Sequence, residues 1–343
     1  MSGRRFDVTA IGNAIVDVIA AADEALLVEH KLVKGAMSLI DAADAERLYR
    51  VMGPGREVSG GSAANTVAGI AALGGRAAYI GKVADDQLGD VFTHDIRAIG
   101  VTYDTPALTE GLSTARSLIF VTPDAARTMQ TFLGATTQLG PEDVNMEYIT
   151  SSRVVYLEGY LWDQPRAKQA MRDAALRAQA SGVTVALTLS DAFCVDRFRD
   201  EFLDLVEHHV DVLFANEGEI LSLYQVRTFD EALQCVRPHC HVAVLTRSEK
   251  GAVVLGGGEV HVIDAVPAVR VVDTTGAGDA YAAGFLYAYT RDCDLATCGR
   301  LGCAMAAEVI GHYGARPEAD VKSIAARVLS GRTTRAGSTR SAG

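Results

Sequence analysis

The sequence lacks the features that mark several common classes of protein. It has no CxxC pair, and its six cysteines all lie at or after Cys194, so a disulfide framework is not expected and a reducing compartment, the cytoplasm, is. It has no apolar run of about 18 residues, the length that a membrane helix needs, and no signal-peptide core follows Met1–Phe6. It also has no Lys/Arg-rich run, and its net charge of −11 argues against a nucleic-acid or membrane-surface partner.

The composition is that of an ordinary globular protein. Hydrophobic residues make up 49% of the 343 residues, and charged residues make up 22%. This length suits one large α/β domain with an appendage, or two domains. We interpret residues 1–330 as a single domain, and we expect residues 331–343, which are rich in Gly, Ser, Thr and Arg, to be a disordered tail.

Strand-like and helix-like segments alternate along most of the chain. Short apolar runs predict strands at residues 6–11, 77–82, 153–157, 183–187, 210–214, 242–246, 252–255, 259–262 and 269–272. Helical periodicity and capping residues predict helices at residues 41–52, 88–99, 165–181, 195–208, 217–224, 229–236, 280–289, 295–310 and 320–329. Repeated strand–helix units imply a three-layer α/β/α fold with a mainly parallel central sheet.

Three other segments carry strand patterns separated by turn residues rather than by helices. They cover residues of about 13–20, 33–40 and 101–133, and the last contains strand patterns at 102–108, 114–121 and 128–133. We expect them to form a small β-sheet outside the main body, where it would serve as a lid. Three of its apolar residues would suit a wall for a nucleobase, or equally the packing of the sheet itself: Met37, Phe120 and Met129.

Polar residues and glycines follow several of the predicted strands. They are Asn13, Gly60–Gly61, Asn216, Thr246 and Gly276. In open parallel sheets, ligands bind beyond the carboxyl ends of the strands. We therefore expect one ligand site at this edge of the main sheet.

The segment Asp273–Phe285 is the most informative of these. Gly276–Gly278 lie where a predicted strand gives way to a helix, so backbone N–H groups without helical partners converge there and the helix dipole adds partial positive charge. The small residues would let an anion approach this turn. Asp279 follows in the first helical turn, where a carboxylate makes sense if it takes the proton from a hydroxyl that attacks the anion's phosphorus. The alternative is an ordinary helix N-terminus with a favourable acidic residue.

Four motifs, in this order, resemble those of the ribokinase-like (PfkB) sugar and nucleoside kinases. They are Asn13…Asp17, Ser59–Asn65, Asn216–Glu219 and Asp273–Asp279. The resemblance spans roughly residues 6–328 and is strongest to the adenosine kinase branch, through segments 12–17, 32–41 and 122–129. It implies the ribokinase-like fold and ATP-dependent transfer of the γ-phosphoryl group, with Mg²⁺, to a primary hydroxyl of a nucleoside or sugar.

The resemblance also implies a role for each motif residue. Asp279 would be the base, and the anion hole would be the backbone of Gly276, Ala277 and Gly278. The acceptor would be held by Asn13, Asp17, Gly61, Asn65 and Asp279. ATP would be bound by Asn216, Glu219, Thr246, Gly251, Gly276 and Gly278. Glu219 would act on Mg²⁺ through water, and Asp273 and Thr275 would belong to a loop that binds a monovalent cation, K⁺.

The motifs leave the acceptor open. Adenosine, giving AMP, is the leading hypothesis, and a sugar kinase for a ribose- or fructose-like acceptor is the second. A non-catalytic sensor of a nucleoside or sugar is the third, although a pure binder has no need of a base at the anion hole. A dinucleotide oxidoreductase is disfavoured because no GxGxxG follows the first strand. The oligomeric state is also open, between a monomer and a homodimer formed through the lid.

Other residues have an ordinary interpretation beside a functional one. Arg116 and Arg127 lie on predicted lid strands, where a solvated edge charge is preferred over contact with the transferred phosphate. The segment Pro238–His241 contains metal-ligand types, but adjacent residues cannot all converge on one ion. Trp162 either borders the cleft or caps the core.

Overall fold

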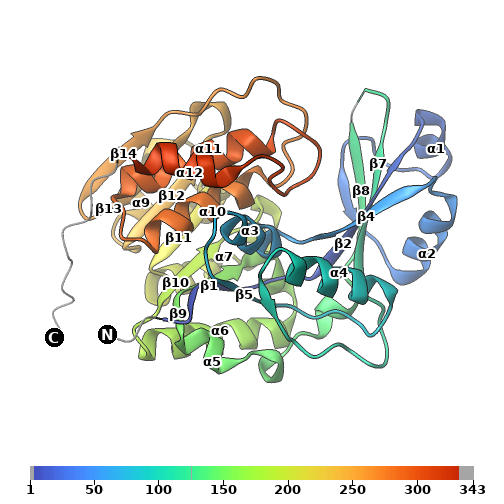
Figure 1. The fold of residues 1–343 in the computed structure, drawn as a ribbon, viewed down its shortest axis with the longest axis horizontal. Helices are drawn as coiled ribbons and strands as arrows, with labels where there is room; N and C mark the ends of the chain where they lie inside the picture. Colours follow the sequence, from blue (N-terminus) through green and yellow to red (C-terminus); the bar gives the residue numbers. More distant parts are fainter. Residues whose placement is uncertain (1–3, 125, 332–343) are drawn as a thin grey trace.

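A nine-stranded sheet runs through the centre of the protein (Figure 1). The structure is a computed structural model, and it describes residues 4–124 and 126–331. Across the sheet the strands are, in order, β14 (Glu259–Ile263), β13 (Ala252–Gly256), β12 (Val242–Thr246), β11 (Val212–Asn216), β10 (Thr184–Thr188), β9 (Ser152–Glu158), β1 (Phe6–Ile11), β5 (Ala77–Ile80) and β6 (Thr102–Tyr103). Strands β12 to β6 run parallel, and β13 and β14 add an antiparallel hairpin at one edge.

Helices cover both faces of this sheet. One face packs against α3 (Ser62–Ala72), α4 (Gln87–Ala98), α10 (Ala277–Tyr289), α11 (Leu295–Val309) and α12 (Val321–Leu329). The other packs against α5 (Met146–Thr150), α6 (Pro165–Ala180), α7 (Ala192–His208), α8 (Glu217–Tyr224) and α9 (Phe229–Val236). Because both faces are covered, β1 and β5 are buried at every residue. The predicted three-layer α/β/α fold is confirmed.

Short 3₁₀ helices lie in the connections between these elements. They are η1 (Gly134–Gln138), η2 (Pro141–Asp143), η3 (Gly159–Asp163) and η4 (Ser248–Lys250). Trp162, in η3, is fully buried against Phe202 with ring centroids 5.6 Å apart, so it belongs to the core rather than to a cleft.

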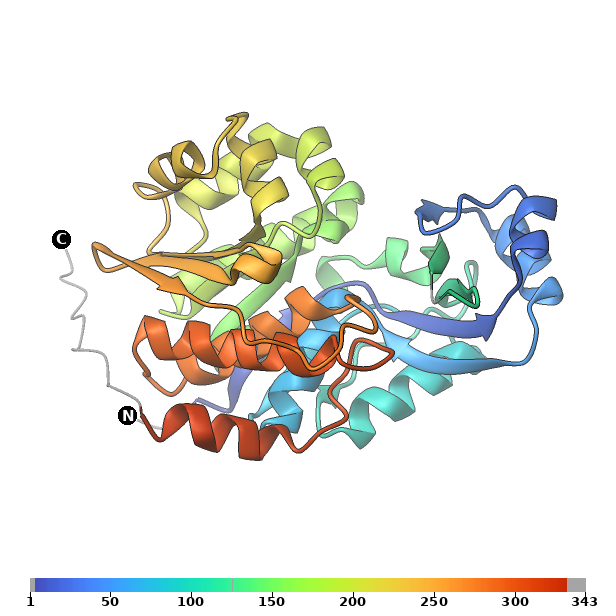
Figure 2. The same ribbon diagram turned by 90° about the horizontal axis from the view of Figure 1, so that it is seen from above.

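A second, five-stranded sheet projects from one side of the body and, with its two helices, forms what we call the lid (Figures 1 and 2). Its strands are, in order, β3 (Met37–Leu39), β8 (Arg127–Phe132), β7 (Ala115–Val121), β2 (Ile15–Ala21) and β4 (Gly55–Gly60). Helices α1 (Glu24–Glu29) and α2 (Ala42–Val51) cover its outer face over a small core formed by Val18, Leu27, Leu48, Leu118 and Phe120.

Alternate residues of the lid strands point the other way, toward the main body, and form the inner face of the lid. Asp17 pairs with Ser117, and Ile119 pairs with Met129, so these four residues share that face. Leu118 and Phe120, one residue on either side of Ile119, face α1 and α2 instead.

The lid differs from the prediction in its composition. Of the segment 101–133, only β7 and β8 belong to it, because β6 pairs in parallel with β5 at the edge of the main sheet. The expected strand at 33–40 shortens to β3. Strand β4 was missed, because Gly55–Gly60 is rich in glycine and charge, and it forms by pairing antiparallel with β2.

The strand predicted at residues 269–272 is also wrong. This β-branched run is irregular, and Val269 and Val271 are exposed to solvent. Its last residue, Val272, donates its N–H to the carbonyl of Ile310 at 2.8 Å rather than to a strand. The anion turn therefore follows an irregular loop instead of a buried strand.

Membrane-spanning helices, disulfides and the tail can be considered only for the described residues. None of the helices in the described ranges is long and apolar enough to cross a membrane. No disulfide joins the six cysteines, all of which lie within the described residues. Apart from Gly331, the tail predicted at 331–343 lies outside the described residues.

Candidate active site

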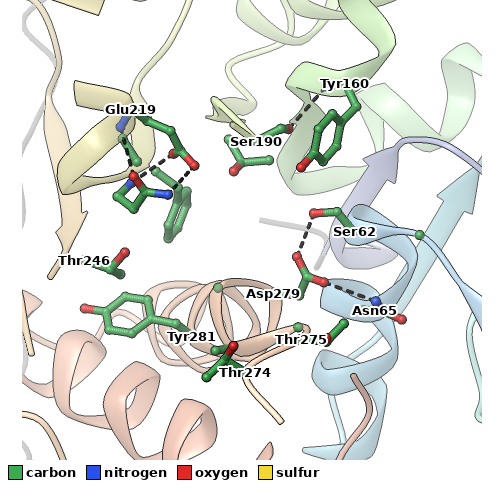
Figure 3. A pocket seen from close by; sticks show the side chains of 18 of the residues that line it. Ser62, Asn65, Tyr160, Ser190, Glu219, Thr246, Thr274, Thr275, Asp279 and Tyr281 are labelled. Carbon is green, nitrogen blue, oxygen red and sulfur yellow. Dashed lines mark hydrogen bonds between the residues drawn. The ribbon is translucent and has the colours of Figure 1, made fainter. Parts of the chain in front are cut away.

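A cavity of about 370 Å³ opens beyond the carboxyl ends of the central strands, beneath the inner face of the lid (Figure 3). It is lined by residues from distant parts of the chain, among them Asp17, Gly61, Ser62, Asn65, Ile119, Met129, Tyr160, Ser190, Asn216, Glu219, Thr246, Thr275, Gly276, Ala277, Gly278, Asp279 and Tyr281. Most of the residues expected from the motifs are thus brought to one place.

The first turn of α10 forms one wall of this cavity. Gly276 precedes the helix with a φ of 75°, and a Cβ at this position would lie 2.4 Å from the Cβ of Ala315, so only glycine fits. A Cβ on Gly278 would meet nothing within 4 Å, so the turn is open on that side. The N–H of Ala277 donates to the carbonyl of Thr274 at 3.2 Å, so one of the three predicted anion-hole groups already has a partner.

Asp279 lies in this first turn and reaches across to α3 (Figure 3). Its Oδ1 accepts a hydrogen bond from the hydroxyl of Ser62 at 2.6 Å, and its Oδ2 accepts one from Nδ2 of Asn65 at 3.1 Å. Removal of the carboxylate from water raises its pKa to about 6, although both hydrogen bonds oppose the rise. Asp279 is therefore ionised at neutral pH, yet basic for an aspartate.

The start of α3 forms the facing wall. Gly61 has a φ of 96°, and a Cβ on it would lie 2.1 Å from the carbonyl oxygen of Asn13. Below it, the buried carboxylate of Glu158 accepts the N–H of Ala63 at 2.8 Å and Nδ2 of Asn13 at 2.8 Å. Burial raises the pKa of Glu158 to about 7, and these hydrogen bonds oppose the rise. Glu158 thus ties the end of β9 to the two loops that carry the acceptor motifs.

Glu158 was not predicted from the sequence, and Asn13 lies differently from the expectation. Asn13 does not line the cavity, because its Nδ2 is held by Glu158 and its Oδ1 accepts the hydroxyl of Thr136 at 2.8 Å. Its side chain therefore supports the Gly61 loop in this structure rather than facing a ligand. Glu158 lies at the end of a buried strand, the same feature that identified the other site residues.

Asp17 enters the cavity from the inner face of the lid. Desolvation raises its pKa to about 6, and the nearby Asp279 adds to the rise. The guanidinium groups of Arg127 and Arg316 act in the opposite direction. Arg316, which belongs to none of the predicted motifs, lies in the segment between α11 and α12.

Asn216 and Glu219 begin α8 and cap it reciprocally. The Asn216 side chain accepts the N–H of Glu219 at 2.9 Å, and the Glu219 carboxylate accepts the backbone N–H of Asn216 at 2.9 Å and its Nδ2 at 2.5 Å. Burial raises the pKa of Glu219 to about 7. Thr246, at the end of the neighbouring β12, lines the same part of the cavity, whereas Gly251 does not and instead closes the turn into β13.

The loop predicted to bind a monovalent cation holds a protein cation instead. Asp273 is buried and forms an ion pair with Arg127 of β8, while its oxygens also accept the N–H of Thr275 at 3.0 Å and that of Gly314 at 3.1 Å. The interpretation of Arg127 as a solvated edge charge is wrong, because it joins the lid to the anion turn. Within the described residues, no group of three or more His, Cys, Asp or Glu side chains is arranged to hold a metal, the Pro238–His241 segment included.

Only part of the expected nucleobase wall faces the cavity. Met129 lines it together with Ile119, which has the same orientation on β7. Phe120 packs in the lid core on the opposite face, and Met37 is half exposed at the edge strand. Period-two alternation along β7 explains the difference, because neighbouring residues point to opposite faces.

A three-layer α/β fold with an open helix N-terminus, an adjacent carboxylate and a covering sheet defines a class of enzyme. These are phosphotransferases that use a hydroxyl of a small molecule as acceptor. The class gives Asp279 a chemical role at the anion turn, where a carboxylate is also favourable for the helix itself.

The comparisons with known proteins narrow this class to one family. Residues 37–321 match the pfkB family carbohydrate kinases, and the chain belongs to that family. It is 54% identical to the adenosine kinase from Sinorhizobium meliloti, whose crystal structure superposes with a TM-score of 0.88 over 94% of this chain and 99% of that one. A probable sugar kinase from Rhizobium etli CFN 42 is 52% identical, with a TM-score of 0.88 over 94% of this chain and 98% of its own.

The name of a third relative gives another acceptor. The ATP-dependent ribose-1-phosphate kinase of Halopiger xanaduensis is 31% identical over 277 residues, which cover 79% of this chain and 86% of that protein. The predicted family and the kinase class are therefore confirmed. The relatives differ in the acceptor that their names give, so the acceptor is a separate question.

Proposed function

We propose that this kinase transfers the γ-phosphoryl group of ATP to the 5′-hydroxyl of a nucleoside, with adenosine as the first candidate and AMP as product. The observation that carries the proposal is the position of Asp279, whose carboxylate lies in the first turn of α10 beside Gly276–Gly278 and faces α3 across the cavity. A hydroxyl held between these walls would lie close both to a base and to an anion-binding turn.

The chemistry follows from the properties of these groups. Asp279 would accept the proton of the attacking hydroxyl, and a pKa of about 6 keeps it ionised at neutral pH while making it a better base than an exposed aspartate. The N-terminus of α10 would stabilise negative charge on the phosphoryl group in flight. Asp17 and Asn65, on either side, would hold the acceptor so that its hydroxyl is in line for attack.

The residues present fit ATP with Mg²⁺. Mg²⁺ commonly keeps several waters and is held by phosphates with one or two carboxylates, so it requires no larger protein cage. Glu219, whose raised pKa marks a desolvated carboxylate, would hold Mg²⁺ through water, with Asn216 and Thr246 beside the phosphates. Bound Mg²⁺ would neutralise charge on the transferred group. A role for K⁺ at Asp273 and Thr275 requires Arg127 to move, and we keep it as a prediction.

Two observations favour a nucleoside. The first is the 54% identity to a protein described as an adenosine kinase, over nearly the whole of both chains. The second is the surface of the cavity, where Ile119 and Met129 of the lid and the ring of Tyr160 offer apolar contacts for a flat base. A sugar kinase is the second candidate, favoured by the names of the Rhizobium etli and Halopiger xanaduensis relatives.

A coupled assay for ADP release tests the proposal. Purified protein with ATP, Mg²⁺ and K⁺ is offered adenosine, other nucleosides, ribose and fructose, and the product of the best acceptor is identified. Adenosine should give the highest kcat/KM. If ribose or a keto-sugar is turned over much faster, the nucleoside assignment fails. If no acceptor is turned over, a non-catalytic sensor replaces it.

Three expectations about the whole protein stay as proposals. Residues 1–330 would form one kinase domain, because β2, β4 and β7 leave the main body and return to it without a linker. Its setting would be the cytoplasm. Its quaternary state would be a monomer or a homodimer through the lid, whose edge strand β3 exposes Met37 and Leu39.

A further inference from the structure

The acceptor site contains more hydrogen-bond acceptors than donors. Asp17 is ionised at neutral pH and can only accept hydrogen bonds. The Nδ2 of Asn65 donates one of its two N–H groups to Asp279, and its Oδ1 is a buried atom that has no hydrogen-bond partner among the described residues. Both groups can receive the protons of a vicinal diol, but the only donor that they offer to its oxygens is the second N–H of Asn65.

A second cavity next to the acceptor site is lined by a residue that can donate hydrogen bonds. It has a volume of about 670 Å³ and lies between β2 and β4 of the lid and residues 313–318. Asp17 and Asn65 line both this cavity and the one that contains Asp279. An acceptor held by these two residues would therefore border the second cavity with its far edge.

Arg316 lines this second cavity, and N–H groups of its guanidinium are available to a ligand. Its Nε and Nη2 are buried and have no hydrogen-bond partner in the part of the chain that the structure describes. The carboxylates of Asp17 and Asp95 act on its guanidinium only through space, and Asp95 already accepts the N–H and the hydroxyl of Ser59 at 3.1 and 3.3 Å. A buried guanidinium with unused donors is costly unless a ligand or water meets them.

The position of Arg316 is fixed relative to the anion turn. Its neighbour Ala315 packs against Gly276 so closely that a Cβ on that glycine would lie 2.4 Å from the Cβ of Ala315. The segment that presents the guanidinium is thus in direct contact with the turn that precedes Asp279. A donor so placed is preorganised with respect to the reacting groups.

We infer that Arg316 is an acceptor-binding residue that donates hydrogen bonds to the hydroxyl oxygens whose protons are received by Asp17 and Asn65. The inference rests on the proposed function, since it assumes an acceptor with a vicinal diol. It gives the diol donors on one side and acceptors on the other, which matches the two roles of each hydroxyl. Arg316 would then set selectivity for the diol without taking part in phosphoryl transfer.

The test pairs substitutions at Arg316 with acceptors that lack one hydroxyl. Wild type, Arg316→Met and Arg316→Lys are assayed with adenosine, 2′-deoxyadenosine and 3′-deoxyadenosine, with binding measured by calorimetry and turnover by ADP release. A hydrogen bond to a charged group is worth about tenfold to a hundredfold in binding. In wild type, one deoxy analogue should bind more weakly by that factor. In Arg316→Met, adenosine should bind more weakly to a similar extent, and the difference between the two should narrow but not vanish, because the hydroxyl still donates to Asp17 or Asn65; kcat should change little.

Two further variants separate this role from a structural one. Arg316→Lys keeps a donor and should recover part of the discrimination. Arg56→Met removes an exposed positive charge from the rim of the same cavity and should leave the discrimination as in wild type. Thermal unfolding checks that each variant is folded.

The inference is overturned if folded Arg316→Met still discriminates against the deoxy analogue as strongly as wild type does, or if no protein in the series discriminates. Failure of the proposed function looks different. A wild-type protein that binds adenosine with Arg316-dependent discrimination but releases no ADP contradicts the kinase assignment and leaves the inference standing. A protein that binds none of the nucleosides contradicts both.

Discussion

Replacement of Asp279 by asparagine is the most direct test of the proposed base. The carboxylate has a pKa of about 6 and accepts hydrogen bonds from Ser62 and Asn65. Asparagine has nearly the same size and keeps one acceptor oxygen, but it cannot take up a proton. The substitution therefore removes the base and preserves the shape of the site.

The expected effect on turnover is large and the effect on binding is small. Proton transfer by a positioned group contributes about 10²–10⁴-fold, and a loose phosphoryl-transfer transition state needs the proton removed only late, so kcat should fall about 10²- to 10³-fold. The new amide group would face Nδ2 of Asn65, but the unpartnered Oδ1 of Asn65 can replace it after the amide rotates. One rearranged neutral hydrogen bond is worth about 1 kcal/mol, so KM for adenosine should change by no more than about fivefold.

The assay is steady-state ADP release over a range of adenosine concentrations, with thermal unfolding as a check on the fold. Asp292→Asn is the matched control, because Asp292 is an exposed carboxylate beyond the far end of α10, paired with Arg153, and its positive φ suits asparagine. The control should have the kcat of wild type. A folded Asp279→Asn protein whose kcat lies within about threefold of wild type would show that Asp279 is not the base.

Three further substitutions test the surroundings of the site. Ser62→Ala removes a hydrogen bond that lowers the pKa of Asp279, so this pKa should rise. Because only the ionised base works, the acid limb of the kcat–pH profile, expected near pH 6, should move to higher pH. An acid limb that does not move would contradict this reasoning. Gly61→Ala imposes a φ of 96° and a backbone clash, so urea titration should show a loss of about 2 kcal/mol in unfolding free energy, whereas unchanged stability would mean that the loop relaxes freely. Arg127→Met leaves Asp273 in a buried site without its cation, so the same titration should show a loss of about 3 kcal/mol in unfolding free energy. A loss no larger than that expected for an exposed ion pair would show that the Arg127–Asp273 pair contributes little to stability.

The main body of the fold was predictable because its elements are defined locally. Strand β1 has the predicted bounds, and the uninterrupted apolar runs of β9 to β12 identified strands covered on both faces. The caps of the helices could also be identified from the sequence. Asp41, before α2, is an example, because its carboxylate accepts the N–H of Asp44.

The errors arose where distant pairing decides the structure. Strand β4 has little strand character of its own and forms because β2 offers a free edge. Conversely, residues 269–272 have strand character but find no partner. Strand β6 has only two residues, and its assignment to the main sheet rather than the lid depends on the neighbouring β5. Local pattern contains no information about which edge is available.

The residues of the candidate site were likewise predictable where local sequence determines their geometry, and not predictable where distant contacts do. Motif residues such as Gly61, Asn65 and Gly276 follow local rules of backbone geometry and line the cavity. The residues that contact them from distant parts of the chain were not predictable, because the sequence does not show which way an arginine side chain points. Arg127 pairs with Asp273 from another sheet, and Arg316 approaches Asp17 from the opposite end of the chain.

The alternation along the lid strands has a consequence for how such enzymes diverge. Leu118 and Phe120 hold the lid to its own helices, whereas Ile119 and Met129 meet the cavity. Substitutions at the second set can reshape the pocket while the first set keeps the sheet folded, and neither set belongs to the turn at Gly276–Asp279. A duplicated gene could therefore acquire a new acceptor through a few changes in the lid and retain its transfer chemistry. Variation in the acceptor among relatives that share a single fold is what such an arrangement permits.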